Sequence, residues 1–166
     1  MRFIVDKTRE PRDLTLVYLP RDYAFSAEPR PADCAYAVGI NDLELMIDEE
    51  ELIIVFATGY CPHPSWQPAK LRPPRAIRAV LLAEADTALL PGRTVGLTAR
   101  DQRWPVFVDV ENGWVCLGPP DRAGRAIEFA SGCVAVLEEG ALVSVWLHPK
   151  ELPSGIKTPS SSQEGV

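Results

Sequence analysis

The chain of 166 residues has a hydrophobic fraction of 46%, a formal net charge of −6 and a pI near 5.0. This length suits one domain with a sizeable core, and the negative charge argues against a general nucleic-acid-binding protein, which needs a positive field. Sixteen prolines and eleven glycines disfavour long helices and suit short strands joined by turns.

The N-terminus begins directly with an apolar run, Phe3–Asp6, and lacks the features of a secretory signal. No window approaches the roughly 18 consecutive apolar residues of a membrane span. The cysteines are far apart in the sequence, and outside an oxidising compartment thiols stay reduced. We therefore expect a cytoplasmic protein in which Cys34, Cys61, Cys116 and Cys133 are free.

Short apolar runs separated by turn signals recur along the chain at spacings of about 8–12 residues, which is typical of a β-sandwich or barrel. No segment shows the apolar period of a helix. We predict an all-β domain, an antiparallel sandwich or flattened barrel of about ten short strands. The candidate strands are Phe3–Asp6, Leu14–Leu19, Ala35–Ile40, Leu43–Ile47, Leu52–Ala57, Ile77–Ala83, Thr94–Thr98, Val106–Val110, Trp114–Leu117, Ala126–Phe129, Val134–Leu137 and Leu142–Leu147.

An acidic turn is predicted between two strands of the N-terminal half. Leu43–Ile47 alternates apolar and acidic residues, which indicates a half-buried strand, and Leu52–Ala57 is apolar on both faces. The turn between them carries four consecutive carboxylates, Asp48, Glu49, Glu50 and Glu51. Because like charges repel, we expect the whole turn to be exposed to water.

Two segments are predicted to be irregular loops, Tyr23–Asp33 and residues 60–75, because both are rich in proline. The second loop carries four side chains that could line a pocket for a small molecule or a metal ion: Tyr60, Cys61, His63 and Trp66. It holds only one Cys–His pair, whereas zinc sites usually take two closely spaced pairs. No metal or cofactor is predicted.

Nucleophilic catalysis needs a serine or cysteine within reach of a histidine, and the chain has only two histidines. Cys61 and His63 are separated by a proline that restricts their geometry. Ser144 and His148 lie about 13 Å apart along a strand. Neither pair has an identifiable carboxylate to orient the histidine, so we predict no catalytic residues and favour a protein that is not an enzyme.

An Asn112-Gly113 step between two apolar runs predicts a β-hairpin with a two-residue turn. This register pairs Glu111 with Trp114 and places Trp114 on a mixed polar face, opposite a face of valines. An indole on such a face is typical of a protein-binding surface, so we predict a surface that includes Trp114 and Glu111. The alternative is that a second sheet or the proline-rich loop covers Trp114.

A second hairpin is predicted for Cys133–Leu147, with its turn at Glu139-Gly140. In this register Trp146 lies opposite Cys133. Both faces of the hairpin are mostly apolar, so we expect it to lie in the interior or against another chain.

The pattern of strand, acidic turn, strand and aromatic residue occurs twice, in Ile47–Phe56 and in Val136–Trp146. Any two hairpins share these features at this level of detail. The sequence therefore leaves open whether the chain contains an internal duplication.

We predict one folded domain over residues 1–151, followed by a disordered tail, 152–166, which has little apolar content. The predicted function is that of a small, soluble, non-catalytic protein-binding module, an inhibitor or immunity-type protein whose acidic surface fits a basic partner. The predicted contact residues are Trp114, Glu111, Asp48, Glu49, Glu50 and Glu51.

Two alternative functions stay open. The first is a β-barrel that binds a small molecule or metal ion at the Tyr60–Trp66 loop and could be an enzyme. The second is a self-assembling structural subunit, a homo-oligomer built on the doubly apolar C-terminal hairpin. Neither nucleic acid nor a membrane is expected as a partner.

Overall fold

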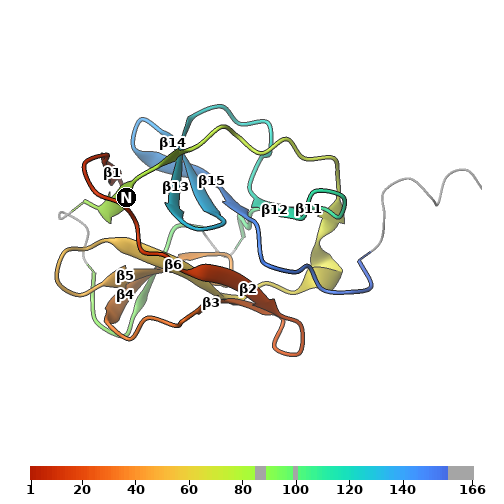
Figure 1. Ribbon diagram of the computed structural model, residues 1–166, viewed down its shortest axis with the longest axis horizontal. Coiled ribbons are helices and arrows are strands. Elements are labelled where there is room, and N and C mark those ends of the chain that lie inside the picture. The colour runs from red at the N-terminus through yellow and green to blue at the C-terminus, as the bar shows by residue number, and fades with distance from the viewer. Residues whose placement is uncertain (85–88, 99–100, 157–166) are drawn as a thin grey trace, which may run out of the picture.

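Fifteen β-strands in three sheets form the regular structure of the described residues, 1–84, 89–98 and 101–156, together with one short 3-10 turn at His63–Ser65 (Figure 1). This computed structural model confirms the all-β prediction. The sheets do not close into a barrel, so the sandwich is the correct one of the two predicted architectures. The described residues contain no helix long and apolar enough to cross a membrane.

The first large sheet has six strands in the order β10-β4-β5-β6-β3-β2. Neighbouring strands are antiparallel except β10, which runs parallel to β4. The strands are β2 (Thr15–Leu19), β3 (Ala24–Glu28), β4 (Cys34–Ile40), β5 (Leu43–Asp48), β6 (Ile54–Tyr60) and β10 (Thr94–Gly96).

The second large sheet has seven strands in the order β7-β11-β12-β15-β14-β13-β8. Its two edge strands, β7 and β8, run parallel to their neighbours, and the other pairs are antiparallel. The strands are β7 (Gln67–Pro68), β8 (Ile77–Arg78), β11 (Val106–Asp109), β12 (Trp114–Leu117), β13 (Arg125–Ala130), β14 (Cys133–Glu138) and β15 (Ala141–Leu147).

A third, two-stranded sheet of β1 (Phe3–Asp6) and β9 (Val80–Ala83) lies at one end of the sandwich. The Phe3 N–H donates to the Gly140 carbonyl over 2.8 Å, and the Ala83 N–H donates to the Leu52 carbonyl over 2.9 Å. The small sheet therefore connects the β14–β15 turn to the β5–β6 turn, and both acidic turns lie at this end.

The two large sheets contain the same five-stranded motif, ordered β4-β5-β6-β3-β2 in the first and β13-β14-β15-β12-β11 in the second. The first hairpin of each motif leaves four loop residues, between the pair Leu19–Ala24 and between the pair Asp109–Trp114. Each motif is also extended by a short parallel strand: β10 pairs with β4 in the first, and β8 pairs with β13 in the second. The chain is thus built as an internal repeat, a possibility that the sequence left open.

A shared β-bulge aligns the two motifs residue by residue. The second strand of the acidic-turn hairpin carries one unpaired residue in each motif, Val55 in β6 and Val143 in β15. A bulge is a specific local feature, and its presence at the same step of both hairpins makes Ile47 equivalent to Leu137. The sequence pattern that matched Ile47 to Val136 is therefore displaced by one residue.

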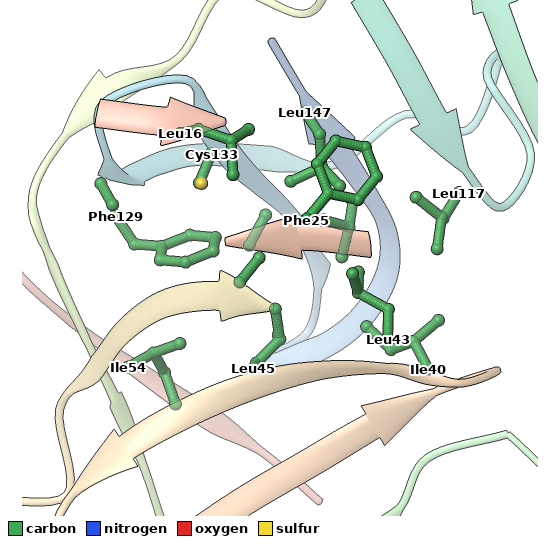
Figure 2. Packing of buried hydrophobic residues seen from close by; sticks show 14 of the residues in the cluster. Leu16, Phe25, Ile40, Leu43, Leu45, Ile54, Leu117, Phe129, Cys133 and Leu147 are labelled. Carbon is green, nitrogen blue, oxygen red and sulfur yellow. The ribbon is translucent and has the colours of Figure 1, made fainter. Parts of the chain in front are cut away.

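The core lies between the two large sheets, where their inner faces meet (Figure 2). Apolar side chains contributed by alternate residues of each strand interdigitate there. The first sheet supplies Leu16, Phe25, Ile40, Leu43, Leu45 and Ile54, and the second supplies Leu117, Phe129, Cys133 and Leu147, among others.

One predicted segment is wrong in its secondary structure, and another is confirmed as strand but is not continuous. The predicted loop Tyr23–Asp33 contains strand β3, which pairs with β2 on one side and β6 on the other. Its sequence has a single large apolar residue, Phe25, so the strand depends on its neighbours rather than on local propensity. The predicted strand Ile77–Ala83 is divided at Ala79 between two different sheets.

The hairpin at Asn112-Gly113 has its predicted faces but not its predicted turn. Asp109 rather than Glu111 pairs with Trp114, so the loop has four residues. Gly113 has a positive φ of 81° and Asn112 does not, whereas the predicted two-residue turn requires positive φ at both. The pairing differs from the prediction by two residues, which leaves the inner and outer faces unchanged.

The C-terminal hairpin has the predicted turn at Glu139-Gly140, with positive φ at both residues. Trp146, however, pairs with Val134 and not with Cys133. The unpaired residue Val143 shifts the register by one, and a sequence pattern does not reveal a bulge of this kind. The prediction that both faces of the hairpin are buried is confirmed.

Replacing a fully buried side chain of this core tests the sandwich. Leu45 is 0% exposed, and Leu45→Ala is expected to lower the free energy of unfolding by about 2–5 kcal/mol, because it leaves a cavity between the sheets. Leu90 is 52% exposed, and Leu90→Ala is expected to change the free energy by less than about 0.5 kcal/mol. Urea unfolding measures both, and equal losses would contradict this packing.

Candidate functional site

The loop that follows β6 is held in place by one phenol. The Tyr18 hydroxyl donates to the Cys61 carbonyl over 2.8 Å and accepts the His63 N–H over 3.1 Å. The Cys61 N–H donates to the Tyr23 carbonyl over 2.7 Å. Burial raises the pKa of Tyr18 to about 12, so its hydroxyl stays protonated and remains a donor at neutral pH.

Six aromatic rings cluster at the end of the sandwich where the loop after β6 lies. Phe25 and Trp66 are stacked with ring centroids 5.9 Å apart, and Tyr18 meets both rings edge-on. The His63 ring contacts Tyr18 and Trp66, and Tyr23 contacts both His63 and Tyr60. We call these six residues the aromatic end.

Two tyrosines of the aromatic end face solvent. Tyr23 is 40% exposed and Tyr60 is 51% exposed, and their rings meet edge to face with centroids 6.5 Å apart. The His63 ring lies 5.5 Å from that of Tyr23. Pairing of Ala24 with Tyr60 brings the β2–β3 turn to the end of β6, which is why residues far apart in the sequence meet here.

Tyr23 adopts a backbone conformation that side chains rarely take. Its φ is +51°, in the left-handed region, and it immediately precedes the second strand of its hairpin. Gly113 holds the equivalent position in the second motif, with φ +81°. Left-handed backbone costs a residue with a side chain roughly 1–2 kcal/mol, so the phenol ring is kept at an energetic cost. Such strain clusters at functional sites.

The four predicted pocket residues line two separate cavities. Tyr60 and Cys61 border a cavity of about 320 Å³, which also includes Arg103 and Trp104. His63 and Trp66 border a cavity of about 290 Å³ on the other side of the loop. The loop itself separates them, so Tyr60, Cys61, His63 and Trp66 do not form a single pocket.

The wall of the larger cavity is held by an asparagine clamp that the sequence did not suggest. The Asn41 amide donates to the Trp104 carbonyl and accepts the Trp104 N–H, both over 2.9 Å. Next to it, Arg103 forms an ion pair with Asp42 over 2.9 Å. These residues stand some sixty positions apart and carry no local motif, so only the packing of the two motifs brings them together.

Trp114, the predicted binding residue, is half-buried. Its ring stacks on His148 with centroids 4.7 Å apart and meets Trp146 edge-on. Gly113 permits this arrangement, because a Cβ there would lie 3.1 Å from His148 Nε2. Glu111 is exposed at the same hairpin turn.

The proline-rich loop covers the outer face of this hairpin, as the alternative interpretation of Trp114 proposed. Residues 69–76, which we call the strap, cross the second sheet from β7 to β8 (yellow-green in Figure 1). The Leu71 N–H donates to the Asp109 carboxylate and the Asn112 amide donates to the Leu71 carbonyl, both over 2.9 Å. The strap seals an apolar cluster of Leu71, Cys116, Ala126, Val134, Val136 and Trp146.

The predicted acidic turn is only partly exposed. Glu49, Glu50 and Glu51 face solvent, but Asp48 is 6% exposed, which corrects the expectation for this residue. Its carboxylate accepts the backbone N–H groups of Glu50, Glu51 and Ile53 and so closes the turn. The short aspartate side chain reaches the backbone N–H groups of its own turn. These hydrogen bonds outweigh the repulsion among the four carboxylates.

The predicted contact residues do not form one surface. Trp114 and Glu111 lie at the hairpin turn near the end of β15, whereas the turn of residues 48–51 lies at the opposite end, beside β1. The aromatic end therefore shares its side of the sandwich with Trp114 and not with the acidic turns.

The four cysteine thiols have raised pKa values and are expected to react slowly. Burial raises the pKa of Cys34 and Cys61 to about 11 and that of Cys116 and Cys133 to about 12. All four cysteines are free, and such thiols are almost fully protonated at neutral pH and therefore poor nucleophiles. Within the described ranges, no three His, Cys, Asp or Glu side chains are grouped where they could hold a metal ion.

Comparison of the sequence with protein-family models and with curated proteins finds no match to either.

Alkylation tests the inert character of the thiols. At pH 8 we expect iodoacetamide to label the native protein at least about tenfold more slowly than the urea-unfolded chain, because raised pKa values and burial both suppress the thiolate. Half-buried Cys34 should be modified first, and peptide mass spectrometry identifies the order. Rapid labelling of native Cys61 would instead indicate an activated thiol.

The role of Asp48 can be tested by removing its carboxylate. Asp48→Ala leaves three backbone donors without their acceptor and is expected to lower the free energy of unfolding by about 1–3 kcal/mol. Exposed Glu49 makes no such bonds, so Glu49→Ala should change it by less than about 0.5 kcal/mol. Chemical denaturation distinguishes this structural role from a surface role, for which both variants would be equally stable.

Proposed function

We propose that this chain is a non-catalytic protein-binding module and that the aromatic end is its contact surface. The observation that carries the proposal is the exposed phenol of Tyr23, held at positive φ beside exposed Tyr60. Tyrosine is enriched in the energetically dominant residues of protein interfaces, because its ring supplies contact area and its hydroxyl a hydrogen bond.

Rigid support favours the aromatic end over other surfaces. The Tyr23 ring contacts those of Tyr60 and His63, and the His63 ring in turn contacts buried Tyr18 and Trp66. Little side-chain freedom is therefore lost when a partner packs against the two tyrosines. The two cavities beside the loop offer depressions into which partner side chains fit. This arrangement supports recognition of a folded protein surface.

The charge of the chain points to a basic partner. A net charge of −6 attracts a positively charged protein over a distance of several ångströms, and exposed phenol rings hold arginine or lysine through cation–π contacts. An inhibitor or immunity-type role in the cytoplasm fits these properties. The acidic turns at the opposite end would contribute to long-range attraction rather than to direct contact.

The proposal predicts that replacing Tyr23 weakens partner binding while leaving the free energy of unfolding almost unchanged. Tyr23→Gly removes the ring but relieves the left-handed backbone, so the free energy of unfolding should change by less than about 1 kcal/mol. Capture of the natural partner should fall by more than about tenfold, as for a residue that dominates an interface. Tyr60→Ala should weaken capture similarly.

Affinity purification from the native cells, followed by quantitative mass spectrometry, measures capture. Leu90→Ala is the matched control, since it removes an exposed apolar side chain in the turn whose Gly92 N–H bonds the Ala35 carbonyl, at the end of β4 beside Asp48 and away from the aromatic end. Undiminished capture by both tyrosine variants, or an equal loss with Leu90→Ala, would refute the aromatic end as the contact surface.

A further inference from the structure

The strap presents a row of cations to solvent. Leu71 and Ala76 pack toward the sheet, while Lys70, Arg72 and Arg75 are exposed. Among the described residues, none of these three cations forms a salt bridge, in contrast to Arg78, which follows in β8 and pairs with Glu10 and Glu128. The strap contains no acidic residue.

The backbone beneath these cations is fixed at both ends. The Ala69 N–H donates to the Val108 carbonyl over 2.9 Å, and Leu71 is held through both its N–H and its carbonyl. At the other end β8 pairs with β13. Cations on a rigid, extended backbone are pre-organised, so binding a partner costs less conformational entropy.

The row differs from the cations elsewhere on the protein in its clustering. Arg9, Arg12, Arg103 and Arg122 form ion pairs with nearby carboxylates. Lys7 and Arg21 form no salt bridge within the described residues, but each is next to an aspartate in the sequence. Charges more than about 8 Å apart are largely screened at physiological salt, so the strap acts as a local positive strip although the whole chain is acidic. A partner would therefore respond to the strip at contact distance.

We propose that the strap is a second interaction surface, which binds an extended acidic segment of a partner protein. Lys70 and Arg72 are alternate residues, both exposed, on either side of buried Leu71. In an extended peptide, carboxylates at alternate positions likewise lie on one side, about 6.6 Å apart, so such a segment can bring one carboxylate to each cation. A long polyanion such as nucleic acid fits less well, because it extends beyond the strap and there meets the rest of a chain whose net charge is −6. This surface is independent of the aromatic end.

The test uses the full chain and a fluorescein-labelled peptide in which glutamate and serine alternate over eight residues. Fluorescence anisotropy at low salt is expected to show saturable binding that weakens as the salt concentration rises. Replacing the three cations together, Lys70→Gln, Arg72→Gln and Arg75→Gln, should lower the affinity at least about tenfold, because each exposed ion pair contributes a modest factor.

A matched control removes three other exposed cations, Lys7→Gln, Arg21→Gln and Arg93→Gln, which lie outside the strap and form no salt bridge within the described residues. This variant has the same net charge as the strap variant and should lose less than about twofold in affinity. An equal loss would show a general charge effect and overturn the proposal. So would unchanged binding by the strap variant.

A second probe decides the class of partner. A single-stranded oligonucleotide of eight nucleotides should bind more weakly than the peptide. If it binds more tightly, and the strap variant loses that binding, the assignment of an acidic protein segment is wrong. Tyr60→Ala should leave peptide affinity unchanged, so a failure here is distinguishable from a failure of the aromatic end.

Discussion

Adjacent residues of β15, Trp146 and Leu147, are 1% and 0% exposed although they lie on opposite faces of the second sheet. A sheet that is apolar on both faces must be covered twice, because exposed apolar area of that size is unfavourable in water. The first sheet covers the inner face and the strap covers the outer one (Figures 1 and 2). The path of the chain between the two motifs follows from this requirement. It also removes the main reason for expecting self-assembly, since the doubly apolar hairpin is covered within the chain.

The same requirement positions the aromatic end. After β6 the chain must leave the first sheet and reach the edge of the second, and residues 61–66 make this crossing at the end of the sandwich. The crossing buries Trp66 beside Tyr18 and leaves Tyr60 at the surface. The candidate site is therefore a consequence of how two motifs are joined, and the loop that carries it also continues into the strap.

The two motifs share a framework and differ in what their equivalent positions carry. At the step before the second strand, Tyr23 stands where the second motif has Gly113. Glycine accepts this conformation without strain, and there it makes room for His148. One motif thus uses the position for packing, while the other keeps an exposed aromatic ring at an energetic cost. This difference between otherwise equivalent turns is what sets the first motif apart from the second at the aromatic end.

The sequence by itself determined the fold class and the apolar faces of both C-terminal hairpins. It also drew attention to the loop with Tyr60, His63 and Trp66, although as the lining of one pocket and not as an aromatic cluster. These follow from side-chain alternation and from proline content, which act over a few residues. Only the tertiary structure decided that β3 is a strand, that Tyr23 joins the site and that Asp48 turns inward. Each of these depends on a partner distant in sequence or on a bulge or turn geometry, and local periodicity contains no information about which strands become neighbours.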